Sequence, residues 1–142
     1  MVITNGISSQ ELLITNLKKY NYKPVIVKEF NNVLNQFYEI SPELVIIDVP
    51  SSKFDAFSWC RQIRNHSICP IIFFSKTNER MEQIMAFEYG ADDYIVAPFH
   101  NGVVLARIHS HLRRVYGEYA SKSDERIINR SGLILCTDKM ED

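Results

Sequence analysis

The sequence predicts an α/β protein with one doubly wound sheet of five parallel strands and helices on both faces of the sheet. Short apolar segments alternate with longer segments in which apolar residues recur at helical spacing. The third and fourth apolar segments read Leu-Val-Ile-Ile and Ile-Ile-Phe-Phe, and this lack of polar alternation is typical of strands buried on both faces. Successive β–α units favour right-handed crossovers, and the strand order 2-1-3-4-5 fits five such units.

The expected strands are short and rich in valine, isoleucine and phenylalanine. They cover residues 1–4, 24–27, 44–48, 70–74 and 93–96. Leu13, Leu17 and Tyr20 follow the helical spacing i, i+4, i+7 in the first of the intervening helices. The fourth helix is expected to end at Gly90, because glycine is a common C-terminal stop, and the fifth near Tyr116.

The helical pattern breaks after Tyr116, and this break predicts how the chain is divided. Residues 1–117 are expected to form the domain with the parallel sheet, and the polar residues 118–125 to form a linker. Residues 126–142 hold two short β-like runs around a Ser-Gly pair, which are too small to stand alone as a hairpin. We interpret residues 126–142 as the incomplete start of a second domain.

Composition and charge predict a soluble, cytoplasmic protein segment. The 142 residues carry a formal net charge of −1, which gives no electrostatic reason for this segment itself to bind nucleic acid. No apolar run approaches the roughly 20 residues of a membrane helix, and the N-terminus lacks a signal pattern. The three cysteines are scattered without metal-ligand spacing, as expected of reduced thiols.

Asp48 is the strongest candidate for a chemical role, because it ends an otherwise apolar strand. In doubly wound sheets the active crevice lies beyond the carboxyl ends of the central strands. Ser75 ends the next strand, so its hydroxyl is expected to face the same crevice. The alternatives are structural: Asp48 simply faces solvent at the end of its strand, and Ser75 caps the loop that follows.

Several motifs resemble the receiver domain of response regulators. They are Leu-Val-Ile-Ile-Asp at 44–48, Asp-Ala-Phe at 55–57, Cys-Arg-Gln-Ile-Arg at 60–64 and Pro-Ile-Ile-Phe-Phe-Ser at 70–75. The most specific is Phe-Glu-Tyr-Gly-Ala-Asp-Asp-Tyr-Ile-Val-Ala-Pro-Phe at 87–99, which resembles the OmpR/PhoB family of two-component transcription factors. Phe-Ser-Trp-Cys at 57–60 resembles the subgroup that responds to cationic peptides and bacitracin. The resemblance covers about residues 1–116, and the tail resembles the start of the family's winged-helix DNA-binding domain.

The resemblance implies a CheY-like fold and a role in phosphorelay signal transduction, with no enzymatic activity. It implies that Asp48 is the phospho-acceptor and that Ser75 is the hydroxyl that follows the phosphoryl group on activation. Tyr94 matches the aromatic switch of the family. Pro98 matches a proline that closes a cis peptide bond in the family.

The chain departs from the family at three positions of the phosphorylation site. Thr4 and Asn5 stand where two acidic residues hold a divalent cation, and Mg²⁺ relies on such carboxylate oxygens. Ala97 replaces a lysine whose charge-assisted contact is worth roughly 1.5–3 kcal/mol. Phosphoryl transfer depends on positioning and charge neutralisation. We therefore expect weak or absent Mg²⁺ binding, no cofactor, and an atypical receiver that works without phosphorylation of Asp48.

The resemblance also implies an output surface, made in the family by the fourth helix, the fifth strand and the fifth helix. Two receivers pair through this surface into a homodimer with an apolar centre and ion pairs between subunits. The matching positions are Ile84, Phe87, Asp92, Asp93, Leu105, Arg107 and Arg114. We expect Asp93 and Arg107 to form the main pair, and weaker packing by Gln83 and Val103 to replace a further one.

Two alternatives stay open at this point. In the first, a sensor histidine kinase phosphorylates Asp48 in the conventional way. In the second, the loop at residues 4–9 binds an anion at a helix N-terminus, as in a flavodoxin-like cofactor-binding domain. In the leading interpretation, a missing C-terminal domain contacts DNA, and no membrane is involved.

Overall fold

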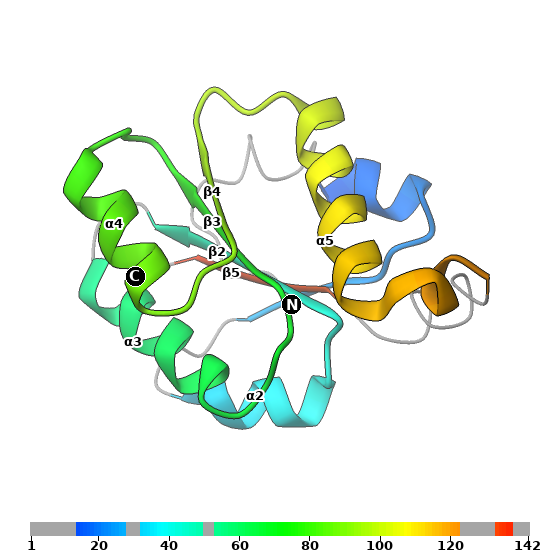
Figure 1. Ribbon diagram of the computed structural model, residues 1–142, viewed down its shortest axis with the longest axis horizontal. Helices are drawn as coiled ribbons and strands as arrows, with labels where there is room; N and C mark the ends of the chain where they lie inside the picture. Colours follow the sequence, from blue (N-terminus) through cyan, green and yellow to red (C-terminus); the bar gives the residue numbers. More distant parts are fainter. Residues whose placement is uncertain (1–13, 28–31, 50–52, 123–132, 138–142) are drawn as a thin grey trace.

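The computed structural model describes residues 14–27, 32–49, 53–122 and 133–137, which form a parallel sheet covered by helices on both faces (Figure 1). The strands are β1 (Pro24–Ile26), β2 (Leu44–Val49), β3 (Ile71–Ser75), β4 (Asp93–Val96) and β5 (Leu133–Thr137). The helices are α2 (Val33–Ile40), α3 (Lys53–Arg64), α4 (Arg80–Glu88) and α5 (Asn101–Lys122), and residues 14–19 are also helical. The predicted α/β class with a parallel sheet is confirmed.

Four strands lie within two residues of their predicted bounds. They are β1 to β4, and every residue of β3 is buried. β3 pairs in parallel with β2 on one side and with β4 on the other. A strand between two parallel neighbours and two helical layers meets no water on either face, which explains its unbroken apolar sequence.

The strand between β1 and β2 is not the one that the sequence predicts. The sheet order is β1-β5-β2-β3-β4, so a C-terminal segment holds this central place. Ile134 of β5 lies opposite Val25 of β1 and Val45 of β2. The predicted strand at residues 1–4 lies outside the described residues, and the order 2-1-3-4-5 is therefore not confirmed.

The physical reason for this difference is that apolar periodicity carries no information about strand order. Residues 133–136 read Leu-Ile-Leu-Cys, which meets the requirement for a strand buried on both faces as well as residues 1–4 do. The structure includes these residues in the sheet. The division at 117, 118–125 and 126–142 stays a prediction, since residues 123–132 and 138–142 lie outside the described part.

Two apolar layers enclose the sheet. On one face, α2, α3 and α4 bury a cluster that includes Phe37, Phe57 and Phe73. On the other face, Leu17 and α5 bury a second cluster that includes Ile108. The two clusters hold the strands in place, so the polar residues at the strand ends have fixed positions.

Two glycines mark the helix ends that the sequence predicts. α4 ends at Glu88, and Gly90 has a φ of +118°, a conformation that other residues rarely adopt. A Cβ atom at Gly90 would lie 2.8 Å from Cγ of Arg64, so this backbone also lies too close to α3 for a side chain. Gly117 interrupts α5 with a φ of +71° and a ψ of −167°, where the linker is predicted to begin. Residues 118–122, the first part of the predicted linker, are helical.

The described residues include no helix that combines the length and the apolar character needed to cross a membrane. Cys60 and Cys69 are buried, and neither is part of a disulfide among the described residues. Burial raises the pKa of both thiols to about 12, so both are protonated at neutral pH.

The stability of this packing is expected to depend on pH through His109 of α5. Its ring lies 6.1 Å from that of Tyr20 and 5.6 Å from that of Tyr22, measured between centroids. Burial lowers the pKa of His109 below its usual 6.5, and the charge of Arg113 acts in the same direction. A base with a lower pKa in the folded state binds fewer protons there than in the unfolded chain.

Stability should therefore be complete above the unfolded pKa and should fall as the pH drops below it. We expect His109→Gln to reduce this dependence, measured as the change in unfolding free energy between about pH 7.5 and about pH 5.5 in urea. The other three of the four histidines are the same in the wild-type chain and in the variant, so their contributions to the pH dependence cancel when the two are compared. An unchanged dependence in the variant contradicts this role of His109.

Candidate functional site

Asp48 and Ser75 lie at the same edge of the sheet, as predicted. Asp48 pairs with Phe74 across β2 and β3, and Ser75 is the next residue of β3. Asp48 is only 6% exposed and Ser75 is fully buried, so neither side chain simply faces solvent. The backbone N–H of Ala97 donates to the carbonyl oxygen of Ser75 over 2.8 Å, which places Ala97 beside this pair. Thr4 and Asn5 lie outside the described residues.

The Ser75 hydroxyl is hydrogen-bonded on the side of α4. Its Oγ lies 3.1 Å from the carbonyl oxygen of Thr77 and 3.3 Å from Oε2 of Glu82, two acceptors for its one proton. The same Oγ accepts a bond of 3.1 Å from the backbone N–H of Thr77. Ser75 is therefore part of a polar cluster with the loop before α4 and with the first turn of α4.

Tyr94 on β4 is connected to the same cluster. Its hydroxyl donates to the carbonyl oxygen of Thr77 over 3.4 Å, and its ring stacks on Phe73 with centroids 6.3 Å apart. The side chain is buried, with 8% exposed. Burial raises the pKa of Tyr94 to about 12; a hydrogen bond with Ser75 opposes this shift, and the charge of Glu82 adds to it. The phenol is thus a neutral donor at physiological pH.

Sequence reasoning missed Glu82. An acidic residue in the first turn of a helix is ordinarily a solvated charge that suits the helix dipole, and the sequence gives no sign that this one is buried. Its contact with Ser75, seven residues earlier, depends on how α4 packs, which the sequence pattern does not specify.

The structure leaves part of the predicted output surface exposed. Ile84 and Phe87 on α4 are 46% and 49% exposed. Met81 on α4 and Val103 on α5 are also exposed. Leu105 differs, because it is 7% exposed and belongs to the core under α5. Its side chain is therefore unavailable to form the centre of a surface, and this expectation is corrected.

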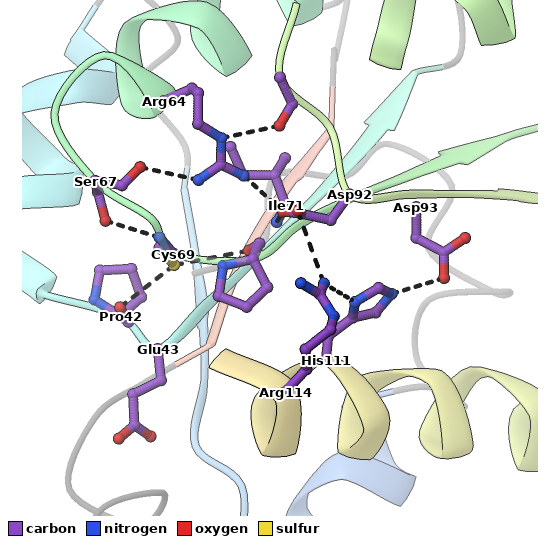
Figure 2. A network of polar contacts seen from close by, with 12 residues as sticks. Pro42, Glu43, Arg64, Ser67, Cys69, Ile71, Asp92, Asp93, His111 and Arg114 are labelled. Carbon is purple, nitrogen blue, oxygen red and sulfur yellow. Dashed lines mark hydrogen bonds and ion pairs between the residues drawn. The ribbon is translucent and has the colours of Figure 1, made fainter. Parts of the chain in front are cut away.

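The acidic and basic residues predicted for contacts between subunits contact one another within the chain. Arg107 Nη1 lies 2.8 Å from Oδ1 of Asp93, and His111 Nε2 lies 2.9 Å from Oδ2 of Asp93. Arg114 Nη2 lies 2.8 Å from Nδ1 of His111 and 3.8 Å from Asp92. His111, which sequence reasoning also missed, thus connects Asp93 to Arg114 (Figure 2).

Asp92 has a structural role that its predicted place on the output surface does not suggest. Oδ2 of Asp92 lies 2.6 Å from Nη2 of Arg64 and accepts a bond of 2.9 Å from the backbone N–H of Ile71 (Figure 2). Arg64 also donates to the carbonyl oxygens of Gly90, over 3.0 Å, and Ser67, over 2.9 Å. One guanidinium thus connects the end of α3 to the loops before β3 and β4.

The peptide bond between Ala97 and Pro98 is cis, as the resemblance implies.

Among the described residues, no three histidine, cysteine, aspartate or glutamate side chains come together in a way that could hold a metal ion.

Comparisons with known proteins agree on the kind of domain. The family model described as the response regulator receiver domain matches residues 1–109. The transcriptional regulatory protein YxdJ of Bacillus subtilis is 41% identical over 141 residues, which are 99% of this chain and 62% of that protein. The sensory transduction protein BceR of Halalkalibacterium halodurans is 42% identical over 109 residues, which are 77% of this chain and 47% of that protein.

A solved structure shows the same fold. The N-terminal domain of the nisin resistance regulator NsrR, a lantibiotic response regulator, has a TM-score of 0.69 and 29% identity, covering 79% of this chain and 95% of that one. This chain spans less than two thirds of the length of the two curated relatives above. The match of the family model over residues 1–109, with the identity to these relatives, shows that the chain belongs to the response regulator receiver domain family.

Proposed function

We propose that this chain is the receiver part of a two-component-type transcriptional regulator of the OmpR/PhoB kind, and that it works without phosphorylation of Asp48. The observation that carries the proposal is Ala97, whose backbone is hydrogen-bonded to Ser75 at the edge where Asp48 lies. The family has a lysine here, which pairs with the acceptor carboxylate and then with the phosphoryl group. A methyl group supplies neither contact, so the charge that builds up during phosphoryl transfer lacks this compensation.

The donor set also does not suit Mg²⁺. This ion requires hard oxygen ligands, and carboxylates at the end of the first strand supply them in the family. Thr4 and Asn5 have no charge, and Asp48 alone provides a weak site. The proposed action of this chain therefore does not depend on a bound cation.

Regulation is proposed to act through pairing of two receivers by the surface formed by α4, β4 and α5. Ile84 and Phe87 are exposed on α4, and exposed aromatic side chains are frequent anchors of interfaces. Asp93 and Arg107 already form an ion pair within one chain at 2.8 Å, so both side chains are held at this surface. An ion pair between two chains would replace this one, so its net contribution to the free energy of pairing is small. DNA binding is assigned to a C-terminal domain beyond this segment, and the protein to the cytoplasm.

The first test asks whether Asp48 accepts a phosphoryl group. We expect no label that alkali or hydroxylamine removes, the behaviour of an aspartyl phosphate, on the wild-type chain after incubation with a cognate sensor histidine kinase and labelled ATP, or with labelled acetyl phosphate. Restoring the family residues in a Thr4→Asp, Asn5→Asp and Ala97→Lys variant should produce Mg²⁺-dependent label, because it returns both the cation ligands and the lysine. The same variant with Asp48→Ala should lose it.

The restored variant shows that the reagents are active, so an unlabelled wild-type chain is informative. Label on the wild-type chain that disappears in Asp48→Ala contradicts the proposal and supports conventional phosphorylation by a partner kinase.

A further inference from the structure

Glu82 is a buried carboxylate beside the candidate phosphorylation site, and none of the roles proposed above uses it. Only 3% of its surface is exposed, although it belongs to the first turn of α4. Its neighbours in sequence, Met81 and Gln83, are not buried. Burial of a charged group is costly unless hydrogen bonds and favourable charges offset it. Such a residue is therefore expected to have a defined function in the fold or in the site.

The contacts of Glu82 lead to the switch residue. Oε2 of Glu82 lies 3.3 Å from the Ser75 hydroxyl, and the oxygen of that hydroxyl accepts a bond of 3.1 Å from the backbone N–H of Thr77. The carbonyl oxygen of Thr77 in turn accepts the hydroxyl of Tyr94 over 3.4 Å. Linked hydrogen bonds polarise one another, so a change at one member affects the others. Glu82, Ser75, Thr77 and Tyr94 thus form one connected unit.

We propose that Glu82 is a positioning residue that holds the Ser75 hydroxyl on the α4 side of the crevice and so keeps Tyr94 buried, whatever the state of Asp48. This inference rests on the proposed function and deepens it, because it names the group that sets the switch when no phosphoryl group does.

The contacts of Glu82 also connect Tyr94 to the output surface. Ile84 and Phe87, the exposed apolar residues of the output surface, belong to the same helix as Glu82. A shift of α4 that breaks the contact between Glu82 and Ser75 is therefore transmitted to Tyr94. Pairing of two chains through α4 should respond to Glu82 and not to Asp48.

The test follows Tyr94 directly. The chain is labelled with 3-fluorotyrosine, the Tyr94 resonance is assigned by its absence in Tyr94→Phe, and burial is measured by the fluorine shift between H₂O and D₂O. We expect a buried signal in the wild-type chain and in Asp48→Ala, with no movement on addition of beryllofluoride. In Glu82→Leu, which has a similar volume but no acceptor, the signal should move to the value of an exposed tyrosine.

Glu82→Gln is the rescue variant, because its amide oxygen still accepts the Ser75 proton, and its Tyr94 signal should stay buried. Glu79→Gln is the matched control: this residue precedes α4 and is exposed, and the signal should not move. Circular dichroism reports whether each variant is folded. If Glu82→Leu does not fold, Glu82→Ala takes its place with the same expectation.

A Tyr94 signal that stays buried in the folded variant without an acceptor overturns the inference, because volume alone then holds the ring. A signal that moves in Asp48→Ala overturns it as well. Failure of the proposed function is distinguishable: kinase label on Asp48 with an unmoved Tyr94 contradicts phosphorylation-independent action and leaves the role of Glu82 standing.

Discussion

Replacing Arg64 by alanine is expected to lower the free energy of unfolding by about 2–3 kcal/mol, the cost of removing one partner from a partly buried charged network. Arg64 is one quarter exposed and bonds to Asp92, Gly90 and Ser67. Without the guanidinium, Asp92 keeps its bond to the N–H of Ile71 and the more distant Arg114 but loses its nearer cation, and two carbonyl oxygens lose a donor. The loss should appear in urea-induced unfolding as a lower midpoint at an unchanged slope.

One variant separates the guanidinium fork of Arg64 from its charge, and a second serves as a surface control. Arg64→Lys keeps the charge but not the planar array of donors, so we expect it to recover only part of the lost stability. Arg80→Ala removes an exposed arginine at the start of α4 and should change stability by less than about 0.5 kcal/mol. Equal effects of Arg64→Ala and Arg80→Ala contradict the structural role of the network.

Replacing Phe87 by aspartate is expected to weaken pairing of two chains by about 30-fold, since truncated interface anchors typically cost about 2 kcal/mol. The ring is half exposed on α4, so the folded monomer has little dependence on it. Sedimentation equilibrium measures the dissociation constant, and urea unfolding of the monomer should be unchanged.

Ile68→Asp provides the matched control for Phe87→Asp. Ile68 is 77% exposed and lies in the segment before β3, away from α4 and α5 in the sequence. The same apolar-to-acid change should leave the dissociation constant unchanged there. If both variants weaken pairing alike, or neither does, the output surface is not where the two chains meet.

The elements that the sequence predicted well are those whose physical cause is local. The apolar segments of β2 and β3 indicated strands buried on both faces, and both strands have all their described side chains buried. Gly90 indicated the end of α4 because its backbone conformation excludes other residues. The central strand could not be predicted with the same reasoning, since residues 133–137 and 1–4 carry the same apolar signal and only tertiary pairing decides between them.

The candidate site, too, could be predicted from the sequence only in part. The rule for doubly wound sheets placed Asp48 and Ser75 at one edge, and the register of β2 and β3 confirms this. The direction of the Ser75 hydroxyl depends on Glu82, whose burial follows from how α4 packs and not from its sequence. Likewise, the position of Leu105 matched the output surface, but its side chain faces the core under α5. Sequence position predicts an element, whereas side-chain direction depends on packing.

The dissociation constant of the receiver pair, with and without a phosphoryl mimic, tests the central claim most directly. It would be measured by sedimentation for the wild-type chain and for Asp48→Ala, each with and without beryllofluoride. We predict the same constant in all four samples, because Asp48 is not the group that sets the output surface. Pairing that occurs only with beryllofluoride, and only when Asp48 is present, contradicts phosphorylation-independent action.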